Sequence, residues 1–442
     1  MSLSRHFQQQ LEGLPTVRST RQSVVAYSGG VDSHVLLHLC KSAGLNMRAV
    51  HVHHGLQDEA DQWSMHCQSV CEQLGIDYTC LHVDAQPKEG ESPEDAARNA
   101  RYRALGDNLE PDEVLLTAHH QEDQAETLLL QLLRSAGPAG LASMPVEKKF
   151  ACSFQVRPLL DFSKQQILQY AEENNLQWIE DPSNADINYG RNYLRNEVMP
   201  VLTSNWPGVT PALCQASALQ QDALEIIEAM AAIDLAAVTA QNTDTLSVSA
   251  LRRLPQARLY NVLRHWINTA GMDKPRRNIL QEIVNNVLPA AEDAIPLVFW
   301  GSTEVRRYQD CLYILPTQQN HEIHQIYSWD GEQPLYLDDL NMELKLVQSA
   351  GKGLQQVAVR HGLSVRFRQG GEYIRPQGRH HKQSLKKLMQ DAGIPPWQRN
   401  RIPLLYIHNE LACVCGYWIA EGFAVKPDQQ GWNPVCQPIG KH

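Results

Sequence analysis

The chain carries the hexapeptide Ser-Gly-Gly-Val-Asp-Ser at positions 28 to 33, directly after the apolar run Val24–Tyr27 and at the start of a helix-length segment, Val31–Ser42. Two adjacent glycines let a backbone turn tightly, so that successive N–H groups, the serine hydroxyls and the positive end of the helix can surround a phosphate. The hexapeptide is neither a Walker A loop nor a GxGxxG fingerprint. Placed between a strand and a helix, it predicts a phosphate-binding loop rather than an ordinary glycine-rich turn.

Short apolar runs alternate with helix-length segments from Gln22 to about Leu133, which is typical of a parallel α/β sheet. We therefore expect the α/β class, with a doubly wound parallel sheet at the N-terminus. The further predicted strands are Met47–His53, Asp77–Val83 and Val114–Thr117, and the further predicted helices are Ala60–Leu74 and Pro93–Leu105, the last with Ser92 as N-cap.

Two stretches rich in proline or polar residues divide the rest of the chain. Residues 200–211 hold three prolines and a glycine, and residues 317–325 form a polar segment. We expect a catalytic domain over residues 1–210, a mostly helical middle domain over 211–325 and a small α+β C-terminal domain over 326–442. The elements predicted there are helix Ala212–Val238, strands Ile295–Trp300, Cys311–Leu315, Glu343–Val347 and Val365–Arg368, helix Ser384–Ala392 and a hairpin from Leu404 to Ile419.

The composition limits the setting of the protein. The chain has 442 residues and a formal charge of −10, and it has neither the apolar run of roughly 20 residues that crosses a bilayer nor the apolar segment of a signal peptide. We expect a cytoplasmic protein without a membrane partner. Its ten cysteines include no CxxC pair, so we expect reduced thiols and no metal site built from protein ligands alone.

Polar residues gather where the second and fourth predicted strands end, at His51–Leu56 and Thr117–Thr127. Ligands of an open parallel sheet bind beyond the carboxyl ends of its strands, so both segments should converge on the phosphate loop. Asp123 and Glu126 lie three residues apart, on one face of a helix that begins near Glu122. Two such carboxylates can hold an ammonium group; a solvated acidic first turn is the alternative.

The hexapeptide resembles the loop with which PP-loop (N-type) ATP pyrophosphatases hold the pyrophosphate of ATP while AMP is transferred to a substrate oxygen. The chain resembles in particular the tRNA(Ile)-lysidine synthetases of that superfamily. The resemblance covers most of the chain, although residues 215–330 match only in general character. It rests on residues 53–56 (HHGL), 97–102 (ARNARY), 119–127 (HHQEDQAET), 137–141 (GPAGL), 157–160 (RPLL), 180–184 (EDPSN) and 191–195 (RNYLR).

This resemblance implies a ligase that uses ATP to join L-lysine to C2 of the wobble cytidine of tRNA(Ile) with a CAU anticodon, through an adenylated tRNA intermediate. ATP, Mg²⁺ and L-lysine would be its small ligands, with Asp32 as a candidate contact of Mg²⁺, and a homodimer is compatible with this function. The ATP loop would comprise Ser28, Gly29, Gly30, Val31, Asp32 and Ser33, and the catalytic residues would be Asp32, Arg98, Arg101, His119, Asp123, Glu126, Arg191 and Arg195.

The resemblance also implies separate roles for these residues. Asp123 and Glu126 would bind lysine, and His119 would contact the adenylate. Arg98 and Arg101 share a helix face and would neutralise charge at the transferring phosphate, with a surface ion pair as the alternative. Arg191 and Arg195 would approach the activated base or the tRNA backbone, with a solvated helix face as the alternative.

Two segments are basic although the whole chain is acidic. Residues 366–401 carry nine Lys or Arg against two acidic residues, and residues 252–277 carry seven against one. Each is a candidate surface for RNA phosphates, with a solvated basic face as the alternative. The expected tRNA-binding residues are Arg366, Arg368, Arg375, Arg379, Lys386 and Lys387.

Three rival functions fit the same fold. Thiolation of tRNA would need sulfur-handling cysteines, against which the missing CxxC pair counts. An amidotransferase synthetase would need an N-terminal cysteine nucleophile, whereas the sequence begins Met1-Ser2. A nonenzymatic RNA- or nucleotide-binding protein would not need an intact Ser-Gly-Gly-Val-Asp-Ser loop.

Overall fold

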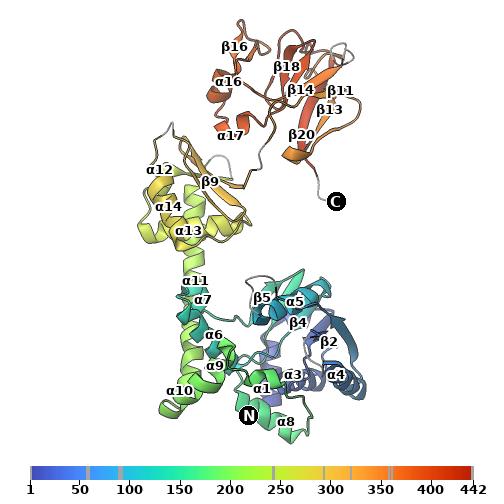
Figure 1. Ribbon diagram of the computed structural model, residues 1–442, viewed down its shortest axis with the longest axis vertical. Helices are drawn as coiled ribbons and strands as arrows, with labels where there is room; N and C mark the ends of the chain where they lie inside the picture. The colour runs from blue at the N-terminus through green and yellow to red at the C-terminus, as the bar shows by residue number, and fades with distance from the viewer. Residues whose placement is uncertain are drawn as a thin grey trace. The chain divides into compact units, whose positions relative to one another are not determined.

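The computed structural model of the chain describes residues 2–55, 60–87, 93–240, 244–291, 294–318, 321–356, 359 and 362–439. The chain forms two compact units, Met1–Met230 and Ala231–His442, which Figure 1 colours from blue to red along the sequence. The limit between the units falls inside one helix, α11 (Val209–Val238). The predicted division into three domains at residues 210 and 325 therefore stays a prediction.

A six-stranded sheet forms the centre of the first unit (Figure 1). All neighbouring strands are parallel except β5, which pairs antiparallel with β6 as an edge hairpin. The predicted parallel α/β domain is confirmed, and the antiparallel edge is an addition that the sequence pattern did not indicate. In spatial order the strands are β3 (Asp77–His82), β2 (Met47–His53), β1 (Gln22–Ala26), β4 (Glu113–Leu116), β6 (Ser153–Val156) and β5 (Glu147–Phe150).

The two faces of this sheet carry separate hydrophobic cores. Val25 packs in one core, whereas its neighbour Val24 packs in the other, because side chains alternate between the faces of a strand. Different helices supply the rest of each core. The first core is supplied by α3 (Val31–Ser42), α4 (Ala60–Leu74) and α8 (Lys164–Glu173), with further side chains from the two N-terminal helices, and the second by α5 (Pro93–Asp107). Ser92, the predicted N-cap of α5, lies outside the described residues.

The proline-rich stretch at residues 200–211 is mostly helical, although we expected an irregular domain boundary there. Pro200 lies at the start of α10 (Met199–Asn205), and Pro211 lies in the first turn of α11. Proline is tolerated in a first helical turn, where its missing N–H would have had no partner in the helix. The other helical segments of this unit are α1 (Leu3–Glu12), α2 (Pro15–Ser19), α6 (Gln121–Leu133), α7 (Pro138–Leu141), η1 (Pro182–Ala185), α9 (Gly190–Tyr193) and η2 (Leu194–Val198).

The second unit begins with helices that pack against a small antiparallel sheet in one core. The sheet has the order β7-β10-β9-β8, so the middle of the chain holds more strand than the predicted mostly helical domain. Its elements are α12 (Val248–Leu251), α13 (Gln256–Thr269), α14 (Arg277–Glu282), η3 (Ile283–Val287), β7 (Thr245–Ser247), β8 (Leu297–Trp300), β9 (Thr303–Tyr308) and β10 (Cys311–Pro316).

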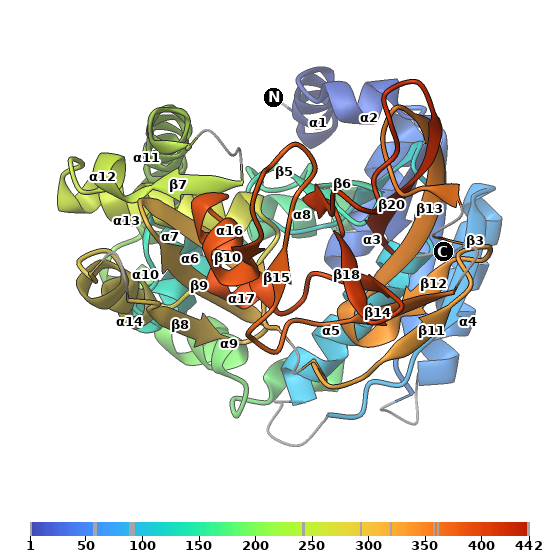
Figure 2. The ribbon, with the colours of Figure 1, turned by 90° about the horizontal axis from the view of Figure 1, so that it is seen from above.

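The C-terminal part of the second unit is rich in β-structure. Figure 2 shows β13 and β20 running side by side, and they pair antiparallel over nine residues each. The predicted hairpin from Leu404 to Ile419 corresponds to three antiparallel strands, β17, β18 and β19. The elements are β11 (Tyr327–Trp329), β12 (Leu335–Leu337), η4 (Asp338–Leu340), β13 (Met342–Ala350), β14 (Leu363–Arg366), β15 (Tyr373–Ile374), β16 (Gln383–Ser384), α16 (Leu385–Asp391), α17 (Pro396–Arg399), β17 (Leu404–Ile407), β18 (Glu410–Val414), β19 (Trp418–Ile419) and β20 (Gln430–Pro438).

Among the described helices, none combines the length and the apolar character that a membrane span requires.

Gly29 fixes the path of the loop between β1 and α3. Its φ is +87°, in the left-handed region, and its carbonyl accepts a hydrogen bond from the N–H of Ile179 at 3.0 Å. A Cβ atom at this position would lie 2.7 Å from Cδ1 of Ile179 and 2.9 Å from Sγ of Cys67. Gly30 has an ordinary φ of −71°, and a Cβ there would meet Oγ of Ser28 at 3.6 Å. The fold therefore requires a glycine at position 29, whereas position 30 has room for a Cβ atom.

We predict that Gly29→Ala lowers the free energy of unfolding by at least about 1 to 2 kcal/mol, the cost of the left-handed conformation, with the two close contacts adding to it. Gly30→Ala is the matched control and should change the free energy by no more than about 1 kcal/mol. Urea denaturation of the two variants and the wild type measures this difference. Equal stability of the two variants would contradict the special role of Gly29.

Candidate active site

The loop at residues 28–33 is closed by its own two serines. Oγ of Ser33 accepts a hydrogen bond from the backbone N–H of Ser28 at 3.2 Å and donates one to the carbonyl of Gly30 at 2.9 Å. The two serine oxygens lie 3.1 Å apart. Gly30 is the N-cap of α3 and Val31 its first residue. The predicted loop residues thus come together at a helix N-terminus, whose free N–H groups favour an anion.

Asp32, in the first turn of α3, is held by two cationic side chains. Nζ of Lys164 lies 2.6 Å from one carboxylate oxygen, and Nε2 of His120 lies 3.7 Å from the other. Burial by itself would raise the pKa of Asp32, but these two neighbours lower it below its usual value. Sequence reasoning missed Lys164, because it is 132 residues away from Asp32 and no local pattern links them. The carboxylate therefore stays ionised beside the phosphate loop.

The adjacent histidines His119 and His120, between β4 and α6, differ in charge. Burial would lower the pKa of His120, but the carboxylates of Asp32 and Glu122 raise it to about 9. Its Nδ1 lies 3.0 Å from Glu122, and its Nε2 lies 3.4 Å from Asp123. Burial lowers the pKa of His119 to about 3. At neutral pH, His120 is consequently charged and His119 neutral.

His119 was expected at the site from the sequence, whereas His120 was not. Nδ1 of His119 is 3.0 Å from Oγ1 of Thr117, whereas His120 is the residue that contacts several carboxylates. The doublet itself was the signal for both residues, but residue type and spacing do not show which ring faces the acidic groups.

Asp123 and Glu126 project from the first turns of α6 and meet two arginines. Nε of Arg191 lies 2.8 Å from Glu126, and Nε of Arg195 lies 2.7 Å from it. The same arginines reach Asp123 at 3.0 and 3.1 Å. The charges of His120 and Arg191 lower the pKa of Asp123 well below its usual value, although burial opposes this. The two expected lysine ligands and the two expected RNA contacts therefore form one cluster of four charges.

A cavity of about 380 Å³ adjoins this cluster. Its wall combines carboxylates, cationic groups and the apolar or hydroxyl side chains of α10 and the start of α11. Such a wall suits a small molecule that carries both charges and an aliphatic chain. The lining residues are His120, Glu122, Glu126, Lys164, Arg195, Met199, Pro200, Thr203 and Thr210.

Arg98 and Arg101 lie on α5 beside the ring of Tyr102. Their guanidinium carbons are 5.1 and 5.8 Å from its centroid, within the range of a cation–π contact. Burial lowers the pKa of Arg101, and the like charges of Arg98 and Arg191 act in the same direction. In the part of the chain that the structure describes, neither arginine forms an ion pair with a carboxylate, so the alternative of a surface ion pair finds no support.

Among the described residues, no group of three or more His, Cys, Asp or Glu side chains is arranged to hold a metal ion. The expected Mg²⁺ would thus need oxygens from a bound phosphate in addition to a carboxylate such as that of Asp32.

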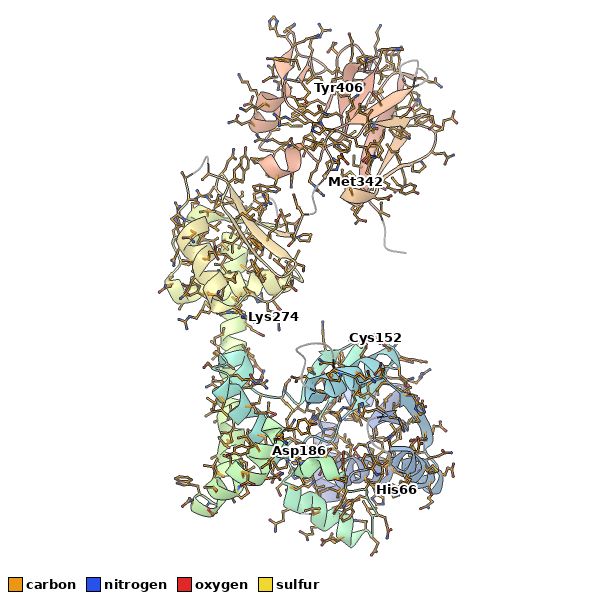
Figure 3. The ribbon with its side chains drawn as sticks, viewed as in Figure 1. His66, Cys152, Asp186, Lys274, Met342 and Tyr406 are labelled. Atoms are coloured by element: carbon orange, nitrogen blue, oxygen red, sulfur yellow. The ribbon has the colours of Figure 1, made fainter. Side chains whose placement is uncertain are left out.

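The basic run of the second unit is divided between paired and exposed side chains. Arg366 packs over the ring of Tyr406, labelled in Figure 3, at 4.5 Å, and Arg368 donates to Asn400 at 3.2 Å. The other four predicted tRNA contacts are exposed, on the segment from β15 to α16. They are Arg375, Arg379, Lys386 and Lys387.

Comparison with known proteins agrees with these features. The chain matches family models described as "PP-loop domain" over residues 3–202, "TilS substrate binding domain" over 246–313 and "TilS substrate C-terminal domain" over 363–436. It is 40% identical to the tRNA(Ile)-lysidine synthase of Coxiella burnetii over 97% of this chain and 96% of that protein. It is 41% identical to the tRNA(Ile)-lysidine synthase of Methylococcus capsulatus over 93% of this chain and 96% of that protein. It is 37% identical to that of Legionella pneumophila over 96% of this chain and 97% of that protein. With this similarity along nearly its whole length, the chain belongs to the tRNA(Ile)-lysidine synthase family.

Proposed function

We propose that the chain joins L-lysine to C2 of the wobble cytidine of tRNA(Ile) with a CAU anticodon, using ATP and an adenylated tRNA intermediate. The observation that carries this proposal is the cavity of about 380 Å³ lined by opposite charges, beside an ionised Asp32 at the start of α3. A phosphate loop alone fits many ATP-dependent enzymes. The adjoining cavity adds a place for a charged amino acid with an aliphatic chain.

The first step activates a poor leaving group. The C2 carbonyl oxygen of cytidine attacks the α-phosphorus of ATP, the bond to the bridging oxygen breaks, and pyrophosphate leaves with the electron pair. The N–H groups of Gly30 and Val31 and the hydroxyls of Ser28 and Ser33 would hold the departing phosphates. Mg²⁺, bound with ATP and contacted by Asp32, would neutralise phosphate charge. Arg98 and Arg101 would face the transferred phosphate.

The second step replaces AMP by lysine. The ε-amine attacks C2, the C2–O bond breaks, and AMP leaves with that oxygen, while the amine gives up a proton. Asp123 and Glu126 would orient the amino acid, as charged hydrogen-bond acceptors for its ammonium groups. Neutral His119 would contact the adenylate at this stage, because its pKa of about 3 keeps the ring unprotonated. The same low pKa makes the ring a weak base, so the proton that the amine gives up would pass to water.

Arg191 and Arg195 require an exchange of partners in this scheme. Each already bonds Glu126 and Asp123, so an incoming ammonium group must share or displace a guanidinium. A guanidinium released from Glu126 could pair with the carboxylate of lysine or with an RNA phosphate. This keeps the sequence-based expectation for the two arginines and adds the step by which they would become available.

The rival functions have less support. Thiolation would need sulfur-handling cysteines, and the described cysteines are free thiols of which Cys40, Cys67, Cys71, Cys413 and Cys415 are buried. A nonenzymatic binder would need neither an ionised Asp32 nor the charge cluster beside it. Activity with lysine decides between these alternatives.

The C-terminal part of the chain, residues 326–442, would bind tRNA away from the reacting base. Arg375, Arg379, Lys386 and Lys387 are exposed on the segment from β15 to α16. None of the ion pairs among the described residues involves these four side chains, and Arg379 donates to the neutral Gln383 at 2.7 Å. Unpaired exposed cations suit the RNA backbone. The middle domain, residues 211–325, would add its own basic run.

We predict that the wild type incorporates labelled lysine into an isoleucine tRNA when it is incubated with ATP, Mg²⁺ and total tRNA. Asp32→Asn should lower this rate by about 100-fold or more while the protein stays folded, because it removes a charge beside the reacting phosphates. Thermal unfolding checks the fold. No incorporation by the wild type would refute the function, and full activity of Asp32→Asn would refute only the role of this carboxylate.

We predict that Asp123→Asn and Glu126→Gln each raise the KM for lysine by about 10-fold or more, since a charged hydrogen bond contributes roughly 1.5 to 3 kcal/mol. The KM for ATP should change by less than about 2-fold. Glu197→Gln, an exposed acidic residue of η2, is the control. A raised KM for ATP with an unchanged KM for lysine would assign both carboxylates to the nucleotide.

We predict that replacing Arg375, Arg379, Lys386 and Lys387 together by alanine weakens tRNA binding and flattens its salt dependence. Each lost phosphate contact should reduce the slope of log affinity against log salt by roughly 0.7 to 0.9. Lys426→Ala, exposed but outside the basic run, is the control. An affinity and a slope equal to those of the wild type would show that the run is only solvated.

A further inference from the structure

Arg157 is a buried cation that pairs with no carboxylate in the described parts of the chain. The residue directly follows strand β6 in the sequence and is only 3% exposed. Nη1 donates to the carbonyl of Pro145 at 2.6 Å, and Nη2 donates to Oε1 of Gln155 at 3.0 Å, so both partners are neutral. Among the described residues, Nε has no hydrogen-bond partner. Burying a charge is costly unless an opposite charge compensates it, which raises the question of which anion belongs here.

The groups around Arg157 are positive as well. Arg98, from α5, lies over one side of Tyr102, and Lys148, from β5, is opposite Gln155 in the hairpin. Burial and the like charge of Arg98 lower the pKa of Arg157. Burial and the charges of Arg157 and Arg98 lower the pKa of Lys148 in turn. The phenol of Tyr102 acts in the opposite direction on both pKa values, but both stay lowered. These cations therefore repel one another, with no carboxylate paired to them among the described residues.

Carboxylates do not relieve this repulsion in the part of the chain that the structure describes. None of the ion pairs found there involves Arg98, Arg101, Lys148 or Arg157. The phenol of Tyr102 responds to the same field: burial would raise its pKa, but the charges of Arg98 and Arg101 lower it. The cluster is thus a concentration of positive charge that an anionic ligand would stabilise.

A chain of buried hydrogen bonds connects this cluster to the active site. Gln155, fully buried, donates from Nε2 to Oγ1 of Thr117 at 2.9 Å, and Thr117 contacts Nδ1 of His119 at 3.0 Å. The cluster lies on the side of the sheet covered by α5, where Phe150 of β5 meets the ring of Tyr102. The phosphate loop opens α3, which packs in the opposite core. The two positive regions therefore flank the strand ends from different faces.

We propose that Arg157 and Lys148, together with Arg98 and Arg101, form a second anion site that holds a phosphodiester of the RNA strand next to the target cytidine. This inference rests on the proposed function, because it assumes that RNA is the substrate. The guanidinium groups supply paired donors that suit phosphate oxygens. Arg98, which would face the transferred phosphate in the first step, would then lie between that phosphate and the RNA backbone.

An RNA phosphodiester fits this position better than the phosphates of ATP do. The phosphate loop already offers a helix N-terminus to the nucleotide, on the other face of the sheet. The cation cluster instead extends outward along the edge hairpin to Lys148, which is exposed on the outermost strand. Cys152, labelled in Figure 3, marks the exposed turn of this hairpin. A long polymer can follow such a path, whereas a nucleotide in the crevice would not need it.

The test uses two neighbouring lysines of β5. Lys148 pairs across the hairpin with Gln155, whereas Lys149 pairs with Phe154, so their side chains leave opposite faces of the strand. Both are exposed. Lys148→Gln removes a charge from the proposed site, and Lys149→Gln is the matched control that removes the same charge from the adjacent position. Arg157→Gln probes the buried member of the site.

Affinity for tRNA is measured at several salt concentrations without ATP or lysine, and the KM for ATP is measured separately. Lys148→Gln should weaken tRNA binding about 3-fold or more and reduce the salt slope by roughly 0.7 to 0.9. Lys149→Gln should leave both unchanged, and all variants should keep the KM for ATP. Arg157→Gln should weaken tRNA binding further, and if it unfolds, the comparison of the two lysine variants still decides.

Three outcomes would overturn the proposal in distinguishable ways. Equal behaviour of Lys148→Gln and Lys149→Gln would show that Lys148 is only a solvated charge. A raised KM for ATP with unchanged tRNA affinity would assign the site to the nucleotide. Wild-type protein that binds no tRNA would refute the proposed function itself, and this second anion site with it.

Discussion

The rest of the site depends on the ionic contacts that the protonated ring of His120 makes with its neighbouring carboxylates. Three carboxylates, those of Asp32, Glu122 and Asp123, lie within 3.7 Å of its nitrogens. These partly buried acids would repel one another without the charged ring between them, and Lys164 and Arg191 add further positive charge beside Asp32 and Asp123. The histidine thus holds the phosphate loop at the start of α3 next to the acidic first turn of α6. Its charge also helps to keep the carboxylates of both segments ionised.

The contrast between His119 and His120 shows how little of this electrostatics depends on residue type. The two rings are adjacent in sequence and both are largely removed from water. Carboxylates surround His120 and raise its pKa, whereas burial lowers that of His119, with the charges of Arg157 and Arg191 adding to it. The surroundings therefore assign a fixed cation to one position and a neutral ring to the next, which lets one doublet serve two purposes.

The sequence predicted the parts of the fold that local patterns encode. Strand β2 and helices α3 and α4 begin and end at the predicted residues, because apolar periodicity reports each element directly. The edge strand β5 escaped prediction since its residues Glu147, Lys148 and Lys149 lack an apolar alternation. The backbone hydrogen bonds of β5 with β6 stabilise this strand although its side chains show no apolar alternation.

Within the candidate site, the sequence predicted the phosphate loop and the shared face of Asp123 and Glu126, both of which involve residues close together in the chain. It did not predict the contact of Lys164 with Asp32, or those of Arg191 and Arg195 with Glu126, across 132, 65 and 69 residues. Such contacts arise only once the sheet has brought distant segments to one edge. Spacing rules carry no information about them.

The buried amide of Gln155 is held in one orientation by its two hydrogen-bond partners. Arg157 has only donors, so the amide oxygen must face it and the amide nitrogen must face Thr117. A threonine hydroxyl that accepts from this nitrogen still has its own proton to donate, and Nδ1 of the neutral His119 is within 3.0 Å. That donation would place the ring proton of His119 on Nε2. The tautomer of a histidine at the centre of the crevice is therefore tied, through an amide that cannot turn over, to an arginine next to the edge of the sheet.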